Sequence, residues 1–238
     1  MKTNTKRVSW LRATIAYISM LLLIVAILPN QAIAGKYRTI EAHLKHQTAD
    51  LSQVKNDKGI LCGCAATAWV IVFDYWKQYK GKERLLTDGS KDEIMNNLAE
   101  ILGRTYGTFR GKQWGRTLPK KMKRACKYVK KFHYKCSIKR VKGSEFKKFW
   151  EVKKALERDE PVIILLNNPK KTFTSLHYAI IEKAELKQKK VLGKWRNRDV
   201  RYWVNMHDGV HKWIWVREVG RNTHPHTGSF SMFFLKIK

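Results

Sequence analysis

The sequence has no internal repeat and no low-complexity stretch, which excludes a repeat architecture and a long disordered tail. Acidic residues are scarce, with 19 Asp and Glu against 49 Lys and Arg, and the formal net charge is +30. A surplus of this size affects solubility and the choice of partners rather than the fold. Hydrophobic residues make up 44% of the chain, with nine Trp, nine Tyr and nine Phe, so we expect a globular protein.

An almost unbroken apolar run occurs at 13–28, after Lys2, Lys6, Arg7 and Arg12. The small-residue pattern Ala32-Ile33-Ala34 follows, as at the cleavage site of a secretory signal peptide. The run is short for a membrane-spanning helix, which needs about 20 residues. We therefore predict a signal peptide over 1–34, cleavage after Ala34 and export to the periplasm or the exterior. An uncleaved anchor is the alternative.

The remaining residues, 35–238, suffice for a single domain with a substantial core. Their basic residues are spread over 111–154 and 183–201 instead of being held in one tail. For an exported chain, the anionic partners on offer are cell-surface polymers and lipids, and nucleic acid is not expected. A solvated cationic surface without a particular partner fits the composition as well.

Helical patterns occupy the first part of this domain, about 35–160, and strand patterns the second, about 161–238. Helices are predicted after Cys64, at 92–102, from Thr117 to about 132 and at 145–157, with a loop at 106–115 and a strand at 134–141. Strands are predicted at 162–166, 176–184, 201–206, 212–217 and 230–237, with a turn at Asp208-Gly209. This order predicts an α+β protein, a helical lobe packed on an antiparallel sheet or partial barrel.

The strongest local signal lies in 58–69, where a Gly-containing loop leads into an apolar helix. From Cys64, apolar residues recur at helical spacing and are numerous enough to predict a central, buried helix. A cysteine in the first turn lies beside unpaired backbone N–H groups and the positive end of the helix dipole, which favour the thiolate. Cys64 is therefore a candidate nucleophile. It is equally a candidate for a small core residue or half of a disulfide.

Four cysteines follow the predicted cleavage site, Cys62, Cys64, Cys126 and Cys136. An even number in an exported protein first suggests two disulfides. If Cys64 is a free nucleophile, one of the other three stays unpaired. Cys126 and Cys136, on a predicted helix and the strand after it, are close enough in sequence to bridge, and Cys62 could pair with either.

Two polar residues interrupt the predicted strands, His177 at the start of one and Asn205 in the next. A buried polar group without a hydrogen-bond partner costs about 1–3 kcal/mol, so two such residues on neighbouring strands can satisfy each other. We predict that His177 donates a ring N–H to Asn205, which would aim its other nitrogen at a nucleophile. The alternatives are a core histidine satisfied by the backbone for His177 and an ordinary strand-end amide for Asn205. His207 is a reserve base if His177 faces away.

The order Cys, His, Asn resembles that of papain-like cysteine peptidases. The closer resemblance is to bacteriocin-leader-processing peptidase-like (double-glycine peptidase-like) domains, many of which carry Gly-Cys-Gly-Pro-Thr-Ala-Trp at the nucleophile. The matching run here is Gly63-Cys64-Ala65-Ala66-Thr67-Ala68-Trp69, and the likeness continues through 161–166, 176–181 and 204–209. The resemblance implies Cys64 as nucleophile, His177 as general base and Asn205 as the residue that orients it.

The sequence departs from this family pattern six residues before the nucleophile, where the family usually places the Gln of the oxyanion hole and Lys58 stands instead. Lys58, Asn56 and Gln53 are the candidates for that donor, beside the backbone N–H of Cys64. Loss of one oxyanion donor typically costs on the order of 10²–10³ in rate.

The predicted function is hydrolysis of a peptide or amide bond in a peptide or protein substrate, through a Cys64 acyl-enzyme. Amidase, deamidase and transglutaminase-like reactions use the same machinery. The alternative is a non-catalytic cationic binding protein that acts on an anionic envelope surface. No cofactor is expected, and no metal, because His224-Pro225-His226 with Cys62 and Cys64 lacks the paired spacing of a zinc site.

Overall fold

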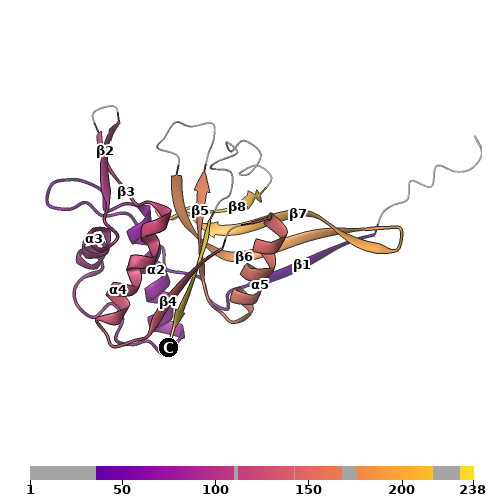
Figure 1. The fold of residues 1–238 in the computed structure, drawn as a ribbon, viewed down its shortest axis with the longest axis horizontal. Helices are drawn as coiled ribbons and strands as arrows, with labels where there is room; N and C mark the ends of the chain where they lie inside the picture. The colour runs from indigo at the N-terminus through magenta and orange to yellow at the C-terminus, as the bar shows by residue number, and fades with distance from the viewer. Residues whose placement is uncertain (1–35, 110–111, 142, 168–175, 217–230) are drawn as a thin grey trace, which may run out of the picture.

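A computed structural model describes residues 36–109, 112–141, 143–167, 176–216 and 231–238. The predicted signal peptide and His224-Pro225-His226 lie outside these residues. Helices and an antiparallel sheet form a body, and a long ribbon of strands extends from it (Figure 1). The α+β class is as predicted, and the sheet is open rather than closed into a barrel.

The helices are α2 (Cys64–Tyr79), α3 (Lys91–Ile101), α4 (Ala125–Lys130) and α5 (Glu145–Glu157), with a 3-10 helix η1 (Pro119–Arg124) before α4. The strands are β1 (Tyr37–His43), β2 (Thr105–Phe109), β3 (Lys112–Arg116), β4 (Cys136–Val141), β5 (Val162–Asn167), β6 (Leu176–Val191), β7 (Lys194–Asn205), β8 (His211–Trp215) and β9 (Met232–Ile237). No helix in the described part of the chain is both long and apolar enough to span a bilayer.

Three predictions about these elements were wrong. The expected loop at 106–115 is the hairpin β2–β3, whose glycines obscured the strand pattern. Strand β1 was not predicted, and β6 and β7 run much further than the apolar residues that identified them. Their extensions are rich in Lys and Arg, so only pairing with neighbouring strands reveals them.

The main sheet is built around β6. Among the described residues, seven strands form it in the order β4-β9-β5-β6-β7-β8, with β1 also paired to β6. Strand β5 pairs with β6 over 176–181, and β1 continues along the same strand over 183–189, opposite β7. Strands β1 and β4 come from the part of the chain predicted to be mainly helical, yet they belong to this sheet. The predicted helical and strand parts, divided near residue 160, are therefore not separate lobes of the structure.

Helices cover both faces of the sheet. On β5, Ile163 and Leu165 pack with α2, α3 and α4, whereas Val162, Ile164 and Leu166 pack with α5. A strand buried on both faces has an unbroken apolar sequence instead of an alternating one, which explains the run at 162–166. Helix α2 is the largest contributor to the first cluster, and its residues from Ala65 to Trp76 are all buried.

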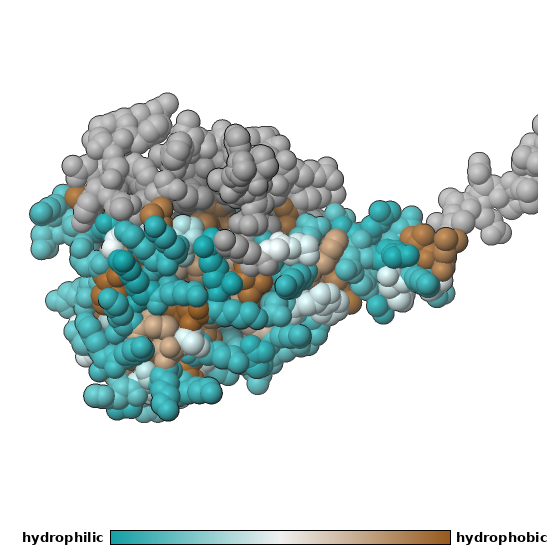
Figure 2. Space-filling view, in the orientation of Figure 1, coloured by the Kyte–Doolittle hydropathy of each residue, from teal (hydrophilic) through white to brown (hydrophobic). Residues whose placement is uncertain are grey.

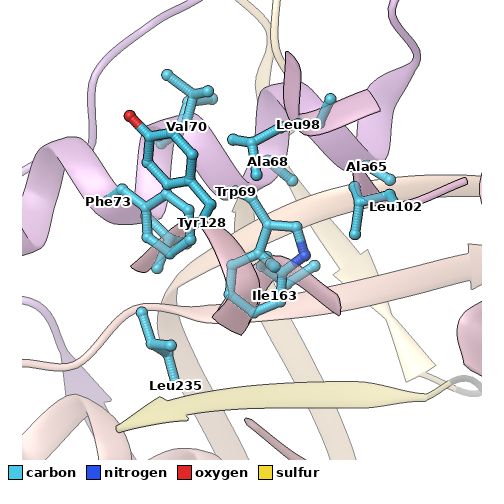
Figure 3. Packing of buried hydrophobic residues seen from close by; sticks show 14 of the residues in the cluster. Ala65, Ala68, Trp69, Val70, Phe73, Leu98, Leu102, Tyr128, Ile163 and Leu235 are labelled. Atoms are coloured by element: carbon cyan, nitrogen blue, oxygen red, sulfur yellow. The ribbon is translucent and has the colours of Figure 1, made fainter. Parts of the chain in front are cut away.

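Trp69 lies at the centre of this packing. Figure 3 shows its ring over Ile163 of β5, with Phe73 and Tyr128 to one side and Leu98 and Leu102 to the other. Its side chain is fully buried, as are those of Phe73 and Tyr128. Helix α2 is thus held in place against the sheet by large apolar side chains, and burial of such side chains is the dominant favourable contribution to folding.

A buried carboxylate at the end of α5 joins three segments. Asp159 Oδ1 accepts hydrogen bonds from the hydroxyl group of Tyr75 on α2 and from the backbone N–H of Lys45 (2.9 Å). Its backbone has a left-handed φ of 59°, which asparagine and aspartate tolerate best. Burial and the carboxylate together raise the pKa of the Tyr75 hydroxyl, so this hydroxyl remains a donor.

We expect Asp159→Ala to lower the free energy of unfolding by about 2–4 kcal/mol, because two donors lose their acceptor and alanine disfavours a left-handed φ. Asp159→Asn is the matched control and should lie within about 1 kcal/mol of the wild type, since its amide oxygen can still accept. Urea denaturation measures both. Equal losses in the two variants would contradict the role assigned to the acceptor.

Candidate active site

Cys64 begins α2 directly after a tight hairpin. The hairpin is closed by a hydrogen bond from the Cys62 N–H to the Val54 carbonyl (2.7 Å). Gly63 then takes a φ of 93°, a conformation that residues with a Cβ rarely adopt, and no side chain caps the helix. Ala66 N–H donates to the Gly63 carbonyl (3.1 Å), whereas the N–H groups of Cys64 and Ala65 face the Cys64 sulfur.

Both Cys62 and Cys64 are free thiols, whereas Cys126 and Cys136 form a disulfide, one of the pairings that the sequence allowed. Cys62 is buried, and its sulfur lies 3.6 Å from the Thr67 hydroxyl. Cys64 is half-buried, and its sulfur accepts a hydrogen bond from the backbone N–H of Tyr178 (3.4 Å). The fold thus brings Cys64 to the residue that follows His177, although 113 positions separate Cys64 from His177 in the sequence.

The ring of His177 is held by a backbone carbonyl. Its Nε2 lies 3.0 Å from the carbonyl oxygen of Met206. A carbonyl can only accept, so Nε2 carries the proton and Nδ1 is left as the basic nitrogen. The predicted hydrogen bond from His177 to Asn205 is wrong. In the described residues the Asn205 side chain bonds to three other groups, and the His177 ring bonds to the carbonyl of Met206, the next residue in the sequence.

Asn205 is fully buried and fixes the segment that carries this carbonyl. Its Nδ2 donates to Thr48 Oγ1 (3.0 Å) and to the Ala49 carbonyl (3.1 Å), while its Oδ1 accepts the His207 N–H (2.8 Å). Thr48 Oγ1 in turn donates to Glu182 (2.6 Å). Asn205 is therefore linked to the His177 ring through the backbone of Met206 and not by a bond of its own side chain to the ring. Thr48 and Glu182 were missed, although a carboxylate after two isoleucines in a strand is a signal that it has a partner.

A second histidine bond mirrors the first. His207 Nε2 donates to the Tyr178 carbonyl (2.7 Å), and the two imidazole rings lie 5.2 Å apart between centroids. The backbone ladder between β6 and β7 ends at Ile180↔Asn205, so beyond it these ring-to-carbonyl bonds hold the chain together. His207 is fully buried, and its Nδ1 has no hydrogen-bond partner among the described residues. His207 therefore has a structural part in the site, where it fixes the backbone of Tyr178.

Burial dominates the protonation of the site. It raises the pKa of the Cys64 thiol to about 11, although the Tyr178 N–H acts in the opposite direction. It also lowers the pKa of His177, and it lowers the pKa of His207 to about 4 with the help of the neighbouring His177. The thiolate expected at a helix N-terminus is therefore not the resting form, because desolvation outweighs the helix dipole. At neutral pH the thiol and both rings are uncharged.

The three oxyanion candidates lie on or beside the hairpin before Cys64. Lys58 is exposed at its tip, and Asn56 Oδ1 accepts the N–H groups of Lys58 (3.1 Å) and Ile60 (2.9 Å). Gln53 is half-buried at the start of the hairpin. None of the hydrogen bonds in the described part of the chain joins these side chains to Cys64. The donors beside the sulfur are backbone N–H groups, those of Tyr178, Cys64 and Ala65.

No group of three or more His, Cys, Asp or Glu within 36–109, 112–141, 143–167, 176–216 and 231–238 is arranged to hold a metal ion. Asp208 and Gly209 form the predicted turn, with left-handed φ values of 54° and 74°. The Gly209 N–H donates to Asp50 Oδ1 (2.7 Å), which ties this turn to the N-terminal segment.

A solved structure and a family model are similar to this chain. A solved structure of a mutant fragment of prointerpain A from Prevotella intermedia is similar, with 13% identity, a TM-score of 0.48, and coverage of 98% of this chain and 84% of that one. No curated protein sequence matches the chain. The model of the Peptidase_C39 like family matches residues 41–198, a range that includes Cys64 and His177 and ends before Asn205. This match spans well over half of the chain, so the protein belongs to the Peptidase_C39 like family, as the resemblance to cysteine peptidases predicted.

Proposed function

We propose that the protein is an exported thiol hydrolase that cleaves a peptide or amide bond in a peptide or protein. The observation that carries this proposal is the position of the free Cys64 thiol, at the N-terminus of a buried helix and in hydrogen-bond contact with the residue after His177. The Met206 carbonyl holds the ring in the tautomer that a general base needs.

In the proposed reaction, Nδ1 of His177 takes the thiol proton as the Cys64 sulfur attacks the carbonyl carbon of the substrate. The oxyanion forms beside the N–H of Cys64 at the start of α2. His177 then gives the proton to the leaving amine, the C–N bond breaks and an acyl-enzyme remains. Water, deprotonated by His177, attacks the thioester carbonyl, and the carboxylic acid and the free thiol are released.

A non-catalytic cationic binding protein is the second candidate. The observation that favours it is Lys58, which stands in the place of the oxyanion glutamine. Lys58 is exposed to solvent at the tip of the hairpin. The high pKa of Cys64 points the same way, because the resting site holds a thiol and not a thiolate.

Thiol labelling separates the two candidates. We expect an epoxysuccinyl inhibitor to modify Cys64 much faster than Cys62, because only an active site binds the inhibitor next to a base. Cys64→Ala should abolish both the labelling and the hydrolysis of an unfolded protein substrate, and Cys62→Ala should preserve both. Equal, slow labelling of the two thiols with no hydrolysis would favour the binding protein.

Alkylation should also report the protonation state. With a Cys64 pKa of about 11, the thiolate fraction rises roughly tenfold for each pH unit below that value. In Cys62→Ala protein, we therefore expect the iodoacetamide rate at Cys64, followed by mass spectrometry, to climb from pH 7 to pH 10 without a plateau. A plateau below pH 7 would show a preformed thiolate–imidazolium pair instead.

The support behind His177 should be needed for hydrolysis. Thr48→Val keeps the shape of the side chain but removes the acceptor of the Asn205 amide and a donor to Glu182. We expect a loss of about 1–3 kcal/mol in stability and a slower hydrolysis, since the Met206 carbonyl becomes less well placed. Hydrolysis at the wild-type rate would show that Asn205 holds this segment without Thr48.

A further inference from the structure

The distal part of the ribbon formed by β1, β6 and β7, residues 36–40 and 186–200, is here called the arm. It extends away from the body, and its end is the β6–β7 turn at Leu192-Gly193 (Figure 1). The backbone N–H of Lys190 donates to the Lys36 carbonyl (2.8 Å), so the start of the described chain lies at this end too. The active site lies at the opposite end of the same strand, where β6 begins.

The end of the arm is apolar and exposed. Leu192 is 97% exposed, Tyr37 65% and Val191 40%, and these are three of the six large hydrophobic residues exposed in the described structure. Figure 2 shows this apolar surface at the far end of the molecule, separated from the body by hydrophilic residues. Large exposed apolar side chains that gather at one place mark a surface that binds something.

Leu192 is unfavourable where it stands. It has a left-handed φ of 47°, followed by 76° at Gly193, which makes the two-residue turn one that prefers Asn-Gly or Asp-Gly. Leucine tolerates this backbone poorly and, at 97% exposure, gains nothing from burial. The stability of the isolated chain therefore does not explain a leucine at the tip.

The rest of the arm is strongly cationic. It contains eight Lys or Arg and a single acidic residue, Asp199. Two aromatic rings lie among these charges: the Arg38 guanidinium is 4.4 Å from the Trp195 ring centroid, and Lys189 Nζ is 5.6 Å from that of Tyr37. An apolar tip flanked by aromatic rings and by Lys and Arg side chains combines the residue types that bind the hydrocarbon, the interface and the headgroups of an anionic bilayer.

We propose that the arm is a membrane-binding element, whose Leu192 tip enters the surface of a bilayer rich in anionic phospholipid. The proposal does not depend on Cys64 chemistry. It places the site at a distance from the membrane set by the length of β6.

Co-flotation with vesicles tests the proposal on the chain from Gly35 onward, which contains every described element. The wild type should bind vesicles of phosphatidylcholine with phosphatidylglycerol and not those of phosphatidylcholine alone. Leu192→Asn should weaken this binding on the order of tenfold, because the inserted side chain is lost. Its melting temperature should be unchanged or higher, since asparagine suits the turn. Trp150→Gln, which removes an exposed apolar side chain from α5, should bind as the wild type does.

Two pairs of charge reversals distinguish the effect of the arm's own charges on vesicle binding from the effect of the net charge. Lys190→Glu with Lys194→Glu changes the arm, and Lys123→Glu with Lys127→Glu makes the same change on exposed residues near α4. The arm pair should lose far more affinity than the control pair. Equal losses in the two pairs, or full binding by Leu192→Asn, would overturn the proposal. A dimer that Leu192→Asn converts to a monomer would also overturn it, by assigning the tip to a second copy.

Discussion

The hydrogen bonds of Tyr178 hold the candidate site together. Its N–H donates to the Cys64 sulfur, its carbonyl accepts from His207, and its hydroxyl donates to the Thr117 carbonyl (3.0 Å). One residue thus joins the start of α2 to β6 and to the turn after β7. Because His177 precedes it, its ring is carried to the same place. The backbone geometry of a strand places these groups more firmly than a flexible loop would.

Strand β6 connects the candidate site to the rest of the molecule. It begins at the site, pairs with β5 and β7 inside the body, and continues into the arm beside β1. Inside the body, both of its faces are covered by helices, so its apolar residues hold the strand rigidly. In the arm the same strand is charged and exposed. The change from core to surface along one strand separates the proposed chemistry from the proposed contact with a membrane.

Burial explains why the groups of the site are neutral at rest. The N-terminus of α2 and the Tyr178 N–H both favour a thiolate, yet removal from water raises the pKa of Cys64 to about 11. The same effect keeps His177 and His207 uncharged. A neutral thiol and a neutral imidazole need no counter-charge in the apolar interior. In the proposed reaction, the proton moves from sulfur to nitrogen only as the substrate is attacked.

The sequence by itself determined the α+β class, the helix that Cys64 begins, and the family, because apolar periodicity and short motifs are local properties. It also singled out His177, since a polar residue in an apolar strand needs a partner. Only the tertiary structure decided what that partner is. Met206 contributes a backbone carbonyl, which every residue has, and so leaves no trace in the sequence. The arm likewise depends on pairing between β1 and β6, which are more than 130 positions apart, and such long-range pairing cannot be read from the local pattern of either strand.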